Sequence, residues 1–162
     1  MFSPILAKLI KEEQGNFMIP ADKIAFVNED NPLYHAFLIL TKVRYAKIPV
    51  LDSGQRAVGL ISLDMITNRM LTTGDIVIAP LSDLKVKDVM QKSFPKLNMA
   101  HANLEDQLNL LIDNNFVVVV DEDDVFQGLI TRREWMKTMN YLSHELDDNY
   151  VASYVQQKLK KA

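Results

Sequence analysis

An internal repeat constrains the fold of this chain more than any other feature of its sequence. Short apolar runs and a Gly-Leu-Ile-Ser/Thr segment occur twice in the same order. In both blocks the second copy follows after 69 residues, so that 48–52 matches 117–121 and 59–62 matches 128–131. The period is too long for a solenoid repeat, and two copies are too few to form a solenoid. The repeat predicts a pseudo-twofold pair of units, 17–73 and 84–140, that bury one shared core.

The local pattern is the same in each unit. An extended segment precedes an amphipathic helix, in which Leu33, Phe37 and Leu40 recur at i, i+4 and i+7 on one face. Two buried strands joined by a polar turn come next, and a second helix begins near Ser62 in the first unit and Thr131 in the second. The pattern predicts an α+β fold of two pseudo-symmetric β-α-β-β-α units.

Capping signals mark the predicted helices. Asp30 or Asn31 is a candidate N-cap before Pro32, and Asn103 with Asp106 gives a matching start signal in the second unit. The segment 131–134, Thr-Arg-Arg-Glu, fits a capping box. Outside the units we expect an N-terminal helix over 1–16, a linker over 74–83, and a C-terminal tail over 141–162 that is helical unless Asp-Asp-Asn at 147–149 interrupts it.

Composition excludes several classes of function. The chain has no cysteine, and its three histidines lack metal-ligand spacing, so we expect neither thiolate chemistry nor a metal. A net charge of −3 does not favour a nucleic-acid partner, and any anionic ligand requires a local positive site. We find no membrane-spanning stretch, no signal peptide and no enzyme motif, and we expect a cytoplasmic protein that is not an enzyme.

The repeated segments resemble a tandem CBS-domain pair, the Bateman module. The resemblance rests on Leu-Lys-Val-Lys-Asp-Val-Met at 84–90, Ile-Pro-Val-Leu-Asp at 48–52 and Gly-Leu-Ile-Thr-Arg-Arg-Glu at 128–134. Segments 17–25 and 40–45 resemble more narrowly the small stand-alone CBS-pair proteins of Gram-positive bacteria that bind cyclic di-AMP, the DarB/CbpB type. The resemblance implies a regulatory protein that binds an adenine nucleotide, cyclic di-AMP above all, without chemistry on it.

The resemblance also implies where the ligand binds. Tyr45 would stack on a purine, two adjacent arginines would hold a phosphodiester, and Glu134 takes the place of the family's ribose-binding aspartate. The expected cleft combines both units: Lys23, Ala25, Tyr45, Ala46, Ile48 and Pro49 face Thr131, Arg132, Arg133 and Glu134. A mirror cleft with Ser62, Asp64 and Val118 should be weaker, which predicts one good site per chain. The family further implies a homodimer and a regulated partner, such as a stringent-response (p)ppGpp synthetase.

Other interpretations of these residues stay open at this point. Thr131 and Glu134 form a helix cap whether or not they bind a ligand, and Arg132 and Arg133 could lie on a solvated helix face. Residues of the type of Tyr45 are more often half-buried packing residues than stacking platforms, and Ile48-Pro49 fits the start of a strand as well as a pocket wall. At the level of function, the alternatives are a sensor of AMP, ADP or ATP, a ligand-free dimerisation or scaffold module, and a nucleotide hydrolase.

Overall fold

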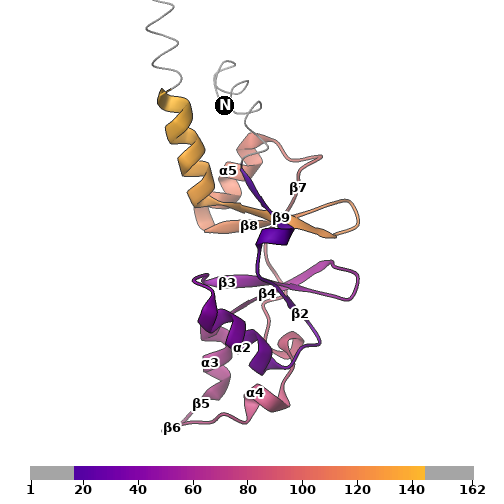
Figure 1. The fold of residues 1–162 in the computed structure, drawn as a ribbon, viewed down its shortest axis with the longest axis vertical. Coiled ribbons are helices and arrows are strands. Elements are labelled where there is room, and N and C mark those ends of the chain that lie inside the picture. Colours follow the sequence, from indigo (N-terminus) through magenta and orange to yellow (C-terminus); the bar gives the residue numbers. More distant parts are fainter. Residues whose placement is uncertain (1–16, 145–162) are drawn as a thin grey trace, which may run out of the picture.

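The computed structural model describes residues 17–144, and these form two sheets that face each other, each covered on its outer side by helices (Figure 1). The predicted helix 1–16 and residues 145–162 of the predicted tail lie outside the described residues. The first unit has a three-stranded sheet of order β2-β3-β4. Its elements are β2 (Val27–Asn28), α2 (Leu33–Lys42), β3 (Lys47–Leu51), β4 (Ala57–Ser62) and α3 (Leu63–Met70).

The second unit repeats this arrangement around a four-stranded sheet of order β1-β9-β8-β7. In both units the first strand runs parallel to the second, which forms an antiparallel hairpin with the third. The predicted α+β pair of β-α-β-β-α units is therefore confirmed. The elements of this unit are β7 (Lys96–Asn98), α5 (Leu104–Asp113), β8 (Phe116–Val120), β9 (Phe126–Thr131) and a helix over residues 132–144.

The segments that lead into the two units are exchanged between them. β1 (Met18–Pro20) precedes the first unit in the chain but pairs antiparallel with β9 of the second, while Gln91 forms a bridge to Leu60 of β4. A glycine on each receiving strand permits the close approach. A Cβ at Gly128 would overlap the Ile19 carbonyl, and one at Gly59 would lie 2.5 Å from Met90 Sδ. β1 and Gln91 each pair with a strand of the other unit, so the two units are linked by main-chain contacts.

Three apolar clusters hold this arrangement together. One lies between the helices and sheet of each unit, with Ile48 and Ile61 in the first and Val117 and Ile130 in the second. The third cluster lies between the two sheets and contains residues from both units: Ile24, Leu51, Ala57, Leu60, Val118, Val120, Phe126 and Leu129. Because both units bury apolar surface there, the core is shared, and their relative position is fixed by packing.

The predicted linker 74–83 contains regular structure. β5 (Leu71–Thr72) pairs with β6 (Asp75–Ile76) in a small hairpin, and α4 (Pro80–Asp83) follows. Leu81 and Val86 are buried in the cluster of the first unit. The connection therefore packs on the unit that it leaves before the chain enters the second unit. Within 17–144, no helix has the length and apolar character needed to span a bilayer.

The capping predictions were partly right. Pro32 occupies the N-cap of α2 without a side-chain bond, and the Asn31 side chain accepts instead from the Asn28 amide, so neither candidate caps this helix. Asn103 and Asp106 form the expected reciprocal pair. Thr131 Oγ1 accepts from the Glu134 amide at 3.1 Å, which confirms half of the predicted box.

Candidate functional site

A cleft of about 500 Å3 lies between the two units, where the start of β3 faces the end of β9. We call it the larger cleft. Its size is within the range of about 300–1,000 Å3 that is typical of small-molecule sites. Residues of both units line it, from Ile19 and Ile24 through segment 44–49 to Asn115, Phe116, Leu129, Thr131, Arg133, Glu134 and Lys137.

Most of the residues predicted from the sequence meet in this cleft. Tyr45, Ala46, Ile48, Pro49, Thr131, Arg133 and Glu134 all line it. Lys23, Ala25 and Arg132 do not. Lys23 is an exposed residue at the end of η2 (Ala21–Lys23), and the next residue, Ile24, reaches the cleft wall. Lys23 therefore lies beside the cleft and not in its wall.

Arg132 is turned away from the cleft. Its Nε donates to the Leu111 carbonyl at 3.0 Å, and its Nη2 donates to the carbonyls of Ile112 and Asn114 at 3.0 and 3.4 Å. The two arginines therefore separate, because adjacent residues of an α-helix point about 100° apart. Of these two arginines, Arg133 lines the larger cleft.

The wall of the larger cleft carries an excess of positive charge. Arg44, Arg133 and Lys137 contribute cations, and among the described lining residues only Glu134 is acidic. Lys47 also lines this cleft, but its Nζ donates to Gln91, which does not line it. Lys137 Nζ donates to Glu134 Oε1 at 2.8 Å, which neutralises part of this charge. The chain as a whole is negative, so the local excess is the positive site that an anionic ligand requires.

Three lining residues were not predicted from the sequence, namely Arg44, Lys47 and Lys137, although the sequence positions of two of them indicate the cleft. Lys137 comes one helical turn after Arg133 and so shares its face. Arg44 precedes Tyr45 on the approach to β3. The local sequence does not predict that Lys47 lines the cleft, because its position there depends on how the two units pack against each other. Asn115 and Phe116 were missed for the same reason.

An apolar shelf completes the larger cleft. Ile19, Ile24, Ile48, Pro49 and Leu129 supply it, and Tyr45, which is 55% exposed, lines the same cleft. A flat apolar wall beside an aromatic ring suits a purine, whose faces favour stacking and dispersion contacts. Cations and an apolar shelf in one cleft fit a ligand that is both anionic and aromatic.

The start of helix 132–144 borders the larger cleft at Thr131. Helix starts attract anions through their free amides and dipole. Two of these amides are already used, since Arg132 N donates to the Asn115 carbonyl at 2.9 Å and Glu134 N donates to Thr131 Oγ1. The helix start therefore offers less hydrogen-bonding capacity than the sequence predicted.

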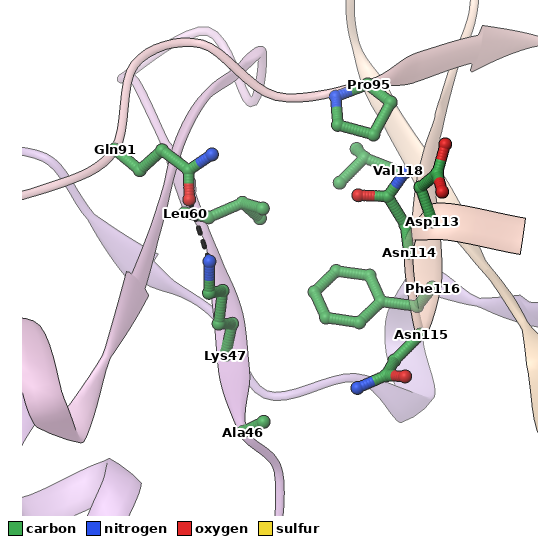
Figure 2. A pocket seen from close by; sticks show the side chains of 10 residues that line it. All are labelled: Ala46, Lys47, Leu60, Gln91, Pro95, Asp113, Asn114, Asn115, Phe116 and Val118. Atoms are coloured by element: carbon green, nitrogen blue, oxygen red, sulfur yellow. Dashed lines mark hydrogen bonds between the residues drawn. The ribbon is translucent and has the colours of Figure 1, made fainter. Parts of the chain in front are cut away.

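A smaller cleft of about 190 Å3 occupies the mirror position (Figure 2). Lys47 Nζ donates to Gln91 Oε1 at 2.8 Å on one side of it, and Phe116 faces this pair from the second unit. Of the residues predicted for this cleft, Val118 lines it. Ser62 is fully buried and Asp64 is exposed, and neither belongs to the lining.

Comparison with known proteins identifies the class to which this arrangement belongs. The family model of the CBS domain matches the chain twice, over 15–72 and 86–141. The chain therefore belongs to the CBS-domain family, as a tandem pair. This confirms the resemblance that the repeated motifs indicated.

Particular relatives cover most of the chain. Cyclic di-AMP receptor B of Bacillus subtilis (strain 168) is 38% identical over 133 residues, which are 82% of this chain and 90% of the relative. The CbpB protein of Listeria monocytogenes in complex with c-di-AMP is 45% identical, with a TM-score of 0.74 and coverage of 82% and 98% of the two chains. A hypothetical conserved protein from Geobacillus kaustophilus is 40% identical, with a TM-score of 0.74 and coverage of 78% and 94%.

Proposed function

We propose that this protein is a sensor that binds cyclic di-AMP in the larger cleft. The observation that carries the proposal is the position of Arg133 and Tyr45 on opposite units across that cleft. Relatives that are 38% and 45% identical are a cyclic di-AMP receptor and a protein solved with c-di-AMP, which supports this ligand over other anionic aromatic molecules.

Each part of the ligand has a complementary group in the cleft. The Arg133 guanidinium offers a planar fork of donors that fits a phosphodiester. Tyr45 and the Ile48-Pro49 shelf contact an adenine face. Glu134 is available to accept from a ribose hydroxyl, with Lys137 holding its carboxylate at 2.8 Å. Lys23, at the rim beside Ile24, supplies a further cation.

Binding across the two units suggests how the signal is passed on. A ligand that contacts both units favours the relative packing in which it binds best. A partner protein that prefers another packing loses affinity by the same factor, because linkage is reciprocal. The ligand is then a signal and not a substrate. The proposal includes a homodimer and a regulated partner in the cytoplasm, a (p)ppGpp synthetase among the candidates.

Calorimetry with a nucleotide panel tests the choice of ligand. We expect cyclic di-AMP to bind at least about 100-fold more tightly than AMP, ADP, ATP or cyclic di-GMP, since only cyclic di-AMP offers two adenines on a compact dianion. Tight AMP binding without cyclic di-AMP binding would identify a different sensor. Chromatography after incubation should recover cyclic di-AMP intact, and a hydrolysis product would contradict the sensor function.

Substitution in the larger cleft tests the site. Arg133→Ala should abolish most cyclic di-AMP binding and leave the melting temperature without ligand close to that of the wild type, because this side chain is exposed. Arg69→Ala is the matched control, since Arg69 is an exposed arginine in the last turn of α3 and lies outside both clefts. Equal loss in both variants would refute the assignment of Arg133.

A further inference from the structure

We infer that Arg132 is a positioning residue, which fastens the start of helix 132–144 to the end of α5 and so holds Thr131 and Arg133 on the larger cleft. The adjacent arginines then have different roles, with Arg133 for the ligand and Arg132 for the frame that carries it. The part of this inference that concerns ligand affinity rests on the proposed function. The fastening of the helix does not depend on it.

The three hydrogen bonds of the Arg132 side chain all go to the C-terminal end of α5. Its guanidinium donates to the carbonyls of Leu111, Ile112 and Asn114, which are the last residues and the C-cap of α5. The final carbonyls of a helix have no partner within the helix, and the negative end of the dipole lies there. A planar guanidinium with several donors satisfies more than one of these carbonyls at once.

α5 has a specific need for this contact. Its last turn contains no basic residue, and its sequence there ends in Asp113. The equivalent helix α2 has Lys42 in its own last turn. The residue that corresponds to Arg132 in the first unit, 69 positions earlier, is Leu63, which cannot donate. The second unit therefore supplies from helix 132–144 the cation that the first unit carries on α2 itself.

The contact also fixes the geometry of the larger cleft. Arg132 N donates to the Asn115 carbonyl at 2.9 Å, so both the main chain and the side chain of this residue hold the turn between α5 and β8. Asn115 and Phe116 follow that turn and line the cleft, while Thr131 and Arg133 flank Arg132 in sequence. One residue thus couples two walls of the cleft, although its own side chain is outside it.

The test compares Arg132→Ala, Arg132→Lys and Arg133→Ala in the full chain. Cyclic di-AMP affinity is measured at several salt concentrations well below the melting temperature. Salt screens the attraction between a cationic side chain and the dianionic ligand. A variant that has lost such a direct contact therefore has an affinity that depends less on the salt concentration. We expect Arg132→Ala to weaken binding about tenfold with the salt dependence of the wild type, and Arg133→Ala to weaken it more with a reduced salt dependence.

Hydrogen exchange measures the fastening independently of the ligand. Amides in 110–115 should exchange faster in Arg132→Ala than in the wild type, and at the wild-type rate in Arg133→Ala. Arg132→Lys keeps one cation near the carbonyls and should restore part of both the protection and the affinity. It also provides a folded variant if Arg132→Ala does not fold.

Two results would overturn the inference. A salt dependence that falls in Arg132→Ala as it does in Arg133→Ala would make Arg132 a direct ligand contact. An unchanged affinity, with faster exchange alone, would leave Arg132 a stabilising residue without a positioning role. If the wild type binds no cyclic di-AMP, the proposed function fails. In that case exchange at 110–115 alone decides whether Arg132 fastens the helix.

Discussion

The larger and the smaller cleft are built from equivalent elements but are lined by different side chains. Arg133 lines the larger cleft, whereas the residue 69 positions earlier in the first unit is Asp64, which does not line the smaller one. Pro49 of the larger cleft corresponds to Val118 of the smaller one. The volumes differ as well, at about 500 and 190 Å3. The repeat therefore duplicates the fold, whereas the two clefts differ in their lining residues and in their volume.

The largest expected effect is that of placing at position 133 the aspartate that the first unit has at the equivalent position, 64. Arg133→Asp should weaken cyclic di-AMP binding by more than about 100-fold, because it replaces a phosphodiester donor with a repulsive carboxylate. Calorimetry gives the affinity. The reciprocal variant, Asp64→Arg, is the control and should leave binding in the larger cleft unchanged. If Asp64→Arg weakens binding as much, the two clefts are not chemically distinct.

A smaller loss is expected at the aromatic edge of the larger cleft. Tyr45→Ala should weaken binding about tenfold, since stacking of a base on an aromatic ring contributes about 1–3 kcal/mol. Tyr45→Phe retains the ring and should bind like the wild type. Fluorescence of a labelled cyclic di-AMP in competition with unlabelled ligand measures both. Equal loss in the phenylalanine variant would show that the hydroxyl, and not stacking, is used.

The exchanged segments provide a matched pair of glycines. Gly128→Ala should displace β1, because the new Cβ overlaps the Ile19 carbonyl, and should cost about 2 kcal/mol of stability together with severalfold in affinity. Gly59→Ala meets chiefly the flexible Met90 side chain, so it should cost less. Since Gln91 lines the smaller cleft, Gly59→Ala should spare cyclic di-AMP binding. Urea unfolding and calorimetry check both variants, and equal affinity losses would contradict the assignment.

The smallest expected effect is a change in the stability of the fold at acid pH, and it concerns Asp52 in the turn between β3 and β4. Backbone donation from Arg56, its guanidinium and the Gly54 amide hold the pKa of Asp52 below its ordinary value. The folded state then binds fewer protons than the unfolded state, so this stability is present above about pH 4 and is lost as the pH falls through the depressed pKa. Asp121 is the equivalent residue, and Val125 replaces the arginine.

Asp52→Asn should therefore reduce the loss of stability between neutral pH and about pH 3, which urea unfolding at several pH values measures. The expected change is modest because the arginine side chain is largely exposed. Asp121→Asn is the matched substitution, since Val125 replaces the arginine at that turn. A steeper acid loss in Asp52→Asn than in the wild type would contradict the sign of this argument.

The sequence predicted the parts of the molecule that depend on local pattern. The two units, the strand hairpins, the Asn103 cap and the Thr131 cap all follow from periodicity and residue preference over short distances. The pairing of β1 with β9 depends on contacts more than 100 residues apart and has no local signal. Lys47 and Phe116 line the clefts only because of the way in which the two sheets pack against each other, so the local sequence did not predict them.

The side chain of Arg132 lies elsewhere than in the cleft to which the sequence assigned it, and the reason is different. The sequence identifies a pair of arginines at a helix start but does not say which acceptor each side chain finds. The final carbonyls of α5 bind the first guanidinium, and helical geometry then directs the second to the larger cleft. Competition between acceptors within the protein and a ligand is a tertiary property, so residue type and spacing alone could not resolve it.

A crystal structure with cyclic di-AMP tests the central claim most directly. We predict one ligand per chain in the larger cleft, with Arg133 on a phosphodiester, Tyr45 against an adenine, and Arg132 still bound to the end of α5. The Lys47–Gln91 hydrogen bond in the smaller cleft should remain. A ligand seated in the smaller cleft, or one that leaves Arg133 without a phosphate contact, would contradict the account.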